Sequence, residues 1–132
     1  DGSSSRSAPF NKEAYQQEIV RSVIDAIATH AAKAEALHVV LDRDGRVKDS
    51  KRNSPYVKLL NQSPNPLMTG YDLKYKLVAH VQDRTTAMCY IKWNGTTPEM
   101  MIPIPYSNYE IYGIKGGGYA VKFIDYWAKN VR

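Results

Sequence analysis

The stretch that decides the fold is YDLKYKLVAHVQ, Tyr71–Gln82, which follows Gly70 directly. Apolar residues occupy every second position in this stretch, and most of the positions between them are polar. Such alternation is typical of a β-strand with one buried face and one solvated face. It therefore predicts a long strand, whose buried face would consist of Tyr71, Leu73, Tyr75, Leu77, Ala79 and Val81.

The residues that follow predict further antiparallel strands. Asp83-Arg84-Thr85 is turn-like, and Thr86–Trp93 reads as the returning strand. Asn94-Gly95 is the strongest short hairpin signal, and it leads into a third strand around Met100–Ile104. Three prolines remove hydrogen-bond donors there, which predicts a strand that lies at an edge or carries a bulge. Two last strands are expected at Tyr109–Ile114 and Tyr119–Trp127.

Three consecutive glycines, Gly116-Gly117-Gly118, separate the last two predicted strands. A glycine loop that binds phosphate lies between a strand and a helix, where backbone amides and the helix dipole both face the anion. Here an alternating β pattern follows the glycines instead. The sequence therefore predicts a hairpin turn at this point and no nucleotide site.

The first half of the chain begins with a predicted helix from Asn11 to about Ala34. Asn11 is a favourable N-cap residue. Apolar side chains then recur every four residues, as on one face of an amphipathic helix. The row consists of Tyr15, Ile19, Val23 and Ile27.

The middle of the chain is less regular. The run Leu37–Leu41, the turn residues Asp42–Gly45 and Arg46-Val47 predict a small hairpin. Ser50–Gly70 contains three prolines, and it leaves room for one short helical turn at Tyr56–Leu60.

Together these elements predict an α+β fold, in which one long N-terminal helix packs on a curved antiparallel sheet of four to six strands. Residues 10–132 form a single domain in this interpretation. The polar, serine-rich residues 1–9 are interpreted as a flexible linker or the scar of a truncation, at the junction with a removed anchor.

Composition narrows the classes of function. The chain has 132 residues, a formal net charge of +5 and one cysteine, Cys89, so no disulfide can form within it. No apolar run approaches the length that crosses a bilayer. The positive charge favours acidic partners, such as nucleic acid, anionic lipid or an acidic protein.

No spacing of histidines and cysteines matches a metal site, and we expect neither a metal nor a cofactor. One basic cluster could contact phosphates, but a solvated loop is the favoured interpretation, because no nucleic-acid-binding module surrounds it. Nucleic acid is therefore a possible partner that ranks below protein. The cluster consists of Arg43, Arg46, Lys48, Lys51, Arg52 and Lys58.

Tyrosines gather in the last third of the chain. Tyrosine at a sheet surface is common in protein interfaces, because one side chain offers both apolar area and a hydroxyl group. We therefore expect a non-catalytic interaction module, with protein partners or self-association. Its predicted binding surface comprises Tyr106, Tyr109, Tyr112 and Trp127.

Two alternatives remain open. Small metal-independent ribonucleases are basic, combine a helix with an antiparallel sheet, and need only a few groups around one phosphate. The candidate catalytic residues for that function are His80, Lys76, Lys92 and Tyr90. A cone-shaped fold could instead enclose a small ligand, in a cavity lined by Tyr15, Tyr75 and Trp93.

The predicted order of elements resembles the cystatin-like folds of the nuclear transport factor two superfamily. Within that superfamily, Gly118-Tyr119-Ala120-Val121 and the later Tyr126 are similar to the final strand of periplasmic scaffold domains of type IV secretion and conjugation systems. Thr86–Tyr90 is similar to a strand in the middle of their sheet. The resemblance implies a periplasmic or extracytoplasmic domain that binds protein partners in a membrane-tethered assembly.

Overall fold

The computed structural model describes residues 11–124, so the predicted linker at residues 1–9 lies outside the described residues. Helices and antiparallel strands occur together, which confirms the predicted α+β class. The elements are α1 (Lys12–Ala32), β1 (Val39–Leu41), β2 (Val47–Ser50), α2 (Pro55–Asn61), α3 (Gly70–Arg84), β3 (Met88–Asn94), β4 (Thr97–Ile104), the 3-10 turn η1 (Tyr106–Asn108), β5 (Tyr109–Gly113) and β6 (Tyr119–Phe123).

Helix α1 confirms the predicted N-terminal helix. The side-chain oxygen of Asn11 accepts hydrogen bonds from the backbone N–H groups of Glu13, at 3.1 Å, and Ala14, at 3.2 Å. These bonds satisfy two of the N–H groups that the first turn of a helix leaves without a partner. The small hairpin, the helical turn at α2 and the strands β3 and β4 also lie where the sequence predicts them.

The predicted long strand at Tyr71–Gln82 is wrong, because this segment lies within helix α3. A capping box begins the helix. The Thr69 hydroxyl accepts from the Asp72 N–H at 3.2 Å, and the Asp72 carboxylate accepts from the Thr69 N–H at 2.9 Å. Leu73 and Leu77 are four residues apart, so they share a helix face as readily as a strand face. The alternation was therefore compatible with both structures.

The close approach of α2 to the start of α3 requires glycine at position 70. A Cβ atom at Gly70 would lie 2.2 Å from the backbone oxygen of Leu60. Without that atom, the Gly70 N–H donates to the Gln62 carbonyl at 2.9 Å. Tertiary packing thus places the end of α2 directly against the first turn of α3.

The single sheet of four to six strands is also wrong. Within the described chain the strands form three separate antiparallel pairs, β1–β2, β3–β4 and β5–β6. The segment expected to join them into one sheet is α3, so the sheet lacks its longest predicted strand. Pro98 and Pro103 remove donors from β4, which pairs with β3 alone in the described chain.

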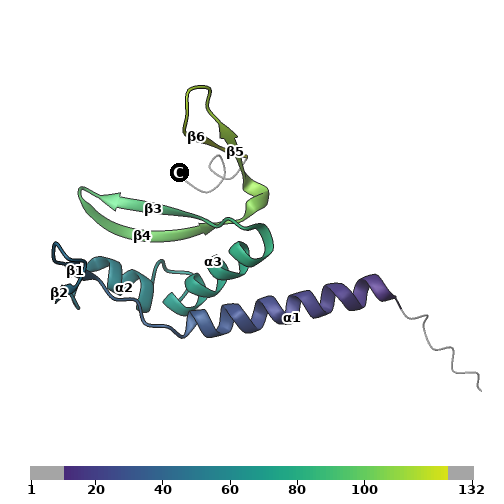
Figure 1. Cartoon of the computed structure of the whole chain (residues 1–132), viewed down its shortest axis with the longest axis horizontal. Helices are drawn as coiled ribbons and strands as arrows, with labels where there is room; N and C mark the ends of the chain where they lie inside the picture. Colours follow the sequence, from purple (N-terminus) through teal and green to yellow (C-terminus); the bar gives the residue numbers. More distant parts are fainter. Residues whose placement is uncertain (1–10, 125–132) are drawn as a thin grey trace, which may run out of the picture.

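The core lies where α2, α3 and β4 meet. Leu59, Leu73 and Met101, one from each element, form a buried cluster. The irregular segment before α3 is tied to β4, since Asn65 Nδ2 donates to the Met101 carbonyl at 2.8 Å. Helix α1 packs on α3 from one side, and the β5–β6 pair lies on the other side, beyond β3–β4 (Figure 1).

The turn between β5 and β6 confirms the interpretation of the three glycines. Gly116, Gly117 and Gly118 have φ angles of 106°, 104° and 93°, a region that L-residues with side chains rarely adopt. The Ile114 N–H donates to the Gly118 carbonyl at 3.1 Å and closes the hairpin.

Candidate interaction surfaces

Helix α1 has two apolar faces, one of small residues and one of large residues. Its small residues Ala28 and Ala32 are 0% and 2% exposed, on the side that packs on α3. On this side the Tyr75 hydroxyl donates to the Asp25 carboxylate at 2.5 Å. Small side chains let two helices approach closely. The helix therefore joins its own fold through alanines, near its C-terminal end.

The large apolar residues of α1 lie on a different side of the helix. With 3.6 residues per turn, the row at four-residue spacing lies nearly opposite Ala28 and Ala32. Ile19 is 46% exposed and Val23 is 53% exposed. We call this side the outward face of α1; its members are Tyr15, Gln16, Ile19, Val20, Ser22, Val23, Ala26 and Ile27.

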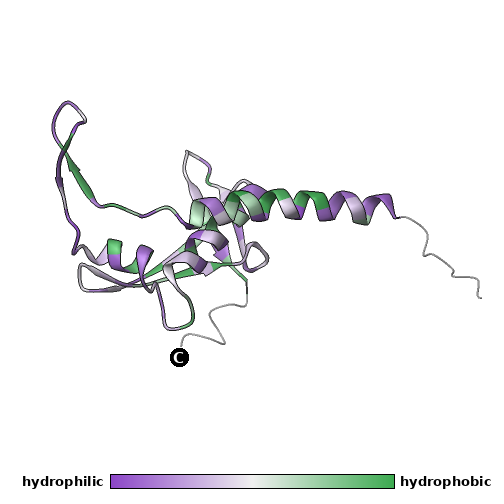
Figure 2. Ribbon diagram, turned by 90° about the horizontal axis from the view of Figure 1, so that it is seen from below, coloured by the Kyte–Doolittle hydropathy of each residue, from purple (hydrophilic) through white to green (hydrophobic). Residues whose placement is uncertain are grey.

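The outward face of α1 carries no charged residue from Tyr15 to Ile27, and Lys12 lies at its N-terminal end. Glu18 borders this face, whereas Arg21 and Asp25 lie on the side toward α3. A shallow hollow follows the face, lined by Tyr15, Glu18, Ile19, Ser22, Val23 and Ala26. The N-terminal half of α1 extends beyond α3 (Figure 1), and apolar residues occur along the helix (Figure 2). The predicted amphipathic helix is present, but it does not pack on a sheet.

The β5–β6 pair, which we call the β5–β6 arm (109–123), also has two chemically different faces. The register pairs Tyr109 with Phe123, Ile111 with Val121 and Gly113 with Tyr119. Side chains alternate along a strand, so these pairs share one face, and it is apolar or aromatic throughout. The opposite face carries the pairs Glu110–Lys122 and Tyr112–Ala120.

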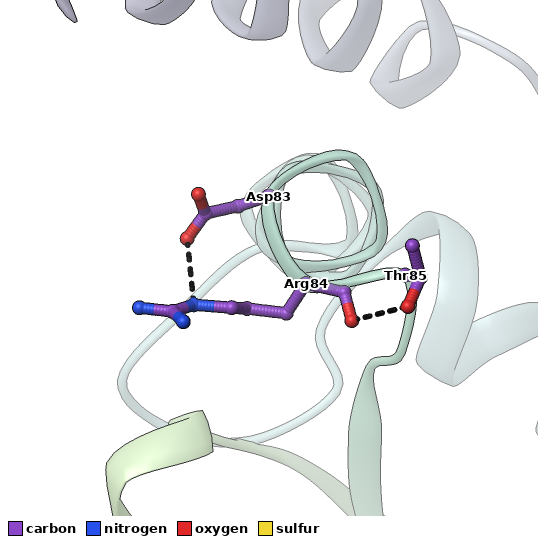
Figure 3. Close-up of polar contacts among 3 residues, drawn as sticks. All are labelled: Asp83, Arg84 and Thr85. Atoms are coloured by element: carbon purple, nitrogen blue, oxygen red, sulfur yellow. Dashed lines mark hydrogen bonds and ion pairs between the residues drawn. The ribbon is translucent and has the colours of Figure 1, made fainter.

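The β5–β6 arm joins the rest of the fold through a short connection. Its main contact in the described chain is with η1. The Arg84 guanidinium lies over the Tyr106 ring in η1, 4.1 Å from the ring centroid. Arg84 also pairs with Asp83 at 3.4 Å, at the end of α3 where Thr85 takes a left-handed conformation with φ of 59° (Figure 3). The arm is thus held at its base.

The residues of the predicted tyrosine surface do not share one face. Tyr106 lies under Arg84, Tyr109 is buried and Tyr112 is exposed. Tyr109 and Tyr112 lie on opposite faces of β5. The Tyr112 hydroxyl donates to the Glu110 carboxylate, and this bond raises the pKa of the phenol. Trp127 lies outside the described residues.

The candidate catalytic residues lie on two elements. Lys76 and His80 are one turn apart on α3, not on a strand, while Tyr90 and Lys92 are on β3. Lys92 pairs with Glu99 of β4 at 3.0 Å. Burial, with Lys76 nearby, lowers the pKa of His80, whose Nδ1 atom is buried and has no hydrogen-bond partner. Cys89 is partly buried in β3, which raises the pKa of its thiol.

The basic cluster lies on and after the β1–β2 hairpin. All six cationic side chains are exposed. The Asp42 carboxylate organises the turn, since it accepts from the N–H groups of Asp44 and Arg46, both at 2.9 Å. Tyr56, which lies between Arg52 and Lys58 in the sequence, is in edge contact with His38 and Trp93.

The structure does not bring the proposed cavity residues Tyr15, Tyr75 and Trp93 together around one cavity. They lie on α1, α3 and β3, and Trp93 contacts Tyr56 at the far end of the β3–β4 pair. Among residues 11–124, no group of three or more histidine, cysteine or acidic residues could hold a metal ion. No helix in the same range is long and apolar enough to span a membrane.

In the part of the chain that the structure describes, a small core and two surfaces with exposed large apolar residues are typical of a protein that assembles with other protein chains. The chain belongs to the phage portal protein family, whose model matches residues 18–130. Portal proteins are oligomeric and form assemblies, in agreement with the expected protein partners or self-association. No curated protein matches the chain.

Membership of this family corrects two interpretations of the sequence. The resemblance to cystatin-like scaffold domains of secretion and conjugation systems is wrong, and so is the function inferred from it. The resemblance depended on a long strand that is helix α3, and on a final strand that belongs to a separate two-stranded arm. Without one continuous sheet, the cone-shaped fold does not form.

The outward face of α1 was not recognised as an interaction surface from the sequence. The signal was present as two apolar rows on one helix, one of alanines and one of large residues. Because close helix pairs favour small residues at their contact, the alanine row marks the side that packs on the chain's own fold. The row of large residues lies on the other side of the helix.

Proposed function

We propose that this chain is a structural component of a phage portal-related assembly and that it functions by contacting other copies of itself. The observation that supports this most directly is the outward face of α1. Ile19 and Val23 are about half exposed on a helix whose other side already packs on α3. A mainly apolar face suits a protein partner better than a polyanion, because burying it removes apolar area from water and desolvates little charge.

Sedimentation velocity over a range of protein concentrations tests this function. We expect the sedimentation coefficient to rise with concentration, since a contact made by one helix face and its surroundings is smaller than the roughly 800 Å² per partner of a stable pair. Ile19→Glu should abolish the rise. Ala14→Glu is the matched control, because it adds the same charge to an exposed position away from the outward face. A wild-type chain that stays monomeric at its highest soluble concentration would contradict the proposal.

A second candidate function is contact with nucleic acid by the basic cluster. The exposure of all six cations on and after one hairpin supports it. Phosphate contacts release counterions, so binding to duplex DNA should weaken steeply as salt rises. Fluorescence anisotropy of labelled DNA measures this, with Arg46→Glu and Lys48→Glu beside the wild type. Equal affinity of all three proteins would exclude the cluster as the contact.

A further inference from the structure

We propose that Tyr56 and Trp93 form a stacking platform for unpaired bases of a single-stranded nucleic acid, beside the basic cluster. This inference rests on the second candidate function, nucleic-acid contact by that cluster, and it names the form of nucleic acid that the site takes. Aromatic side chains stack on the bases of single strands, because an unpaired base offers a free ring face. The cations of the basic cluster then contact the phosphates of the same strand.

The first argument is the arrangement of the two rings. Tyr56 lies in the first turn of α2 and Trp93 lies near the end of β3, and their ring centroids are 6.5 Å apart at an interplanar angle of 74°. In such an edge contact the edge of one ring meets the face of the other, so the contact covers only one ring face of the pair. Tyr56 is 36% exposed and Trp93 is 49% exposed. The pair therefore presents ring surface to solvent, where a base can stack.

The second argument is that the rings are held in place before a ligand binds. His38, just before β1, is in edge contact with Tyr56, with ring centroids 5.7 Å apart. Its Nδ1 atom shares a hydrogen bond of 2.7 Å with the hydroxyl group of Ser54, which is buried directly before α2. The segment before β1, helix α2 and the end of β3 thus meet at Tyr56, at one end of the molecule (Figure 1). A preorganised platform loses less conformational entropy on binding.

The third argument is the charge beside the rings. The Lys51 N–H donates to the His38 carbonyl at 2.8 Å, so the backbone of the basic cluster passes directly by the aromatic residues. Residues 50–71 include Lys51, Arg52 and Lys58 and contain no acidic residue. The aspartates near the cluster lie on the β1–β2 hairpin, and they are Asp42, Asp44 and Asp49. A single strand suits this surface, because its bases meet the rings while its phosphates meet the cations.

Fluorescence anisotropy of labelled single strands tests the platform. The probes are oligo-thymidylate and oligo-uridylate of about ten nucleotides, and a duplex of the same length is the third ligand. Trp93→Leu keeps an apolar side chain but removes the ring, so its affinity for the single strands should fall about tenfold. Trp93→Phe keeps a ring and should stay within about threefold of the wild type. Affinity for the duplex should not change in either variant, because paired bases offer no free face.

Tryptophan fluorescence gives a second readout, which a purely structural role of Trp93 would not produce. A base stacked on Trp93 should quench its emission in the wild type, and this quench should disappear in Trp93→Phe, which still binds. Trp127 is unchanged in both proteins, so the difference reports on Trp93. Tyr119→Leu is the matched control, because it removes an exposed ring from the β5–β6 arm and should bind like the wild type. Circular dichroism should show that each variant remains folded.

The inference is overturned if Trp93→Leu binds single strands as tightly as the wild type, or if it loses the same affinity for the duplex. A wild type saturated with a single strand but without the quench would also overturn it, and the rings would then serve the fold or a protein partner. A tenfold loss with either single strand supports the inference, and the strand that binds more tightly identifies DNA or RNA as its source. A wild type that binds neither single strands nor duplex would instead contradict the second candidate function itself, so the two failures are distinguishable.

Discussion

Leu73 and Ile19 are both aliphatic residues inside helices, yet Leu73 is fully buried and Ile19 is 46% exposed. The side chain of Leu73 meets Leu59 and Met101, which come from α2 and β4 of the same chain. Ile19 lies on the side of α1 away from α3. Apolar character predicts that a residue will be buried, but only the surrounding elements decide whether its own chain buries it.

The largest expected effect is at the contact between α2 and α3. Gly70→Ala would place a Cβ atom 2.2 Å from the Leu60 backbone oxygen and 2.8 Å from the Asn61 carbonyl carbon. Two backbone segments would have to separate, so we expect a loss of about 3 kcal/mol or more in the free energy of unfolding. Urea denaturation measures this loss. Gly113→Ala is the matched control, because its Cβ atom would meet nothing within 4 Å.

The comparison between Leu73 and Ile19 can be tested directly. Leu73→Ala removes a buried side chain and leaves a cavity, so it should lower the free energy of unfolding by about 2–3 kcal/mol. Ile19→Ala removes a similar side chain from an exposed position and should change it by about 0.5 kcal/mol or less. Both values should be measured by urea denaturation of dilute, monomeric protein. Equal losses at the two positions would show that α1 is buried in the monomer.

A smaller effect is expected at the start of α3, where Thr69 makes the capping box with Asp72. Thr69→Ala removes the hydroxyl that accepts the Asp72 N–H, and should cost about 1 kcal/mol of stability. Thr69→Ser retains the hydroxyl and should remain close to wild type. Thermal unfolding followed by circular dichroism compares the three proteins, and an unchanged midpoint for Thr69→Ala would show that packing alone begins the helix.

The smallest effect concerns His80, whose pKa is lowered from 6.5 chiefly by burial. The unfolded chain takes up a proton on this residue at higher pH than the folded chain does. The stability associated with neutral His80 is therefore complete above about pH 6.5 and decreases as pH falls below it. Urea denaturation between pH 7.5 and about 5 should show a decrease that His80→Gln reduces. Equal pH dependence in both proteins would show that His80 titrates normally in the fold.

Signals within short stretches of sequence were sufficient to predict most of the individual helices, strands and turns. Asn11 and the four-residue row indicated α1, and Asn94-Gly95 indicated the turn between β3 and β4. The three glycines indicated the last hairpin, because only glycine adopts three successive positive φ angles at low cost. These signals act within a few residues, so one sequence contains all the information that they require.

The candidate interaction surfaces were harder to predict from the sequence. Tyrosine content drew attention to Tyr106, Tyr109 and Tyr112, but composition does not indicate which face of a strand a residue occupies. The register of β5 with β6 divides these tyrosines between two faces and gathers Ile111 and Val121 with Tyr109. Register depends on how two strands pair, and this pairing cannot be read directly from the sequence.

The sequence by itself determined the α+β class, the length of α1 and the turns of the three hairpins that form, whereas the turn predicted at Asp83-Arg84-Thr85 is the end of helix α3. Tertiary structure alone decided that Tyr71–Gln82 is helical and that the strands form three separate pairs. The reason is that Leu73 and Leu77 satisfy a period of two and a spacing of four equally well. The contacts of Leu73 with Leu59 and Met101, and of Gly70 with the end of α2, favour the helix, and those partners come from segments distant in the chain.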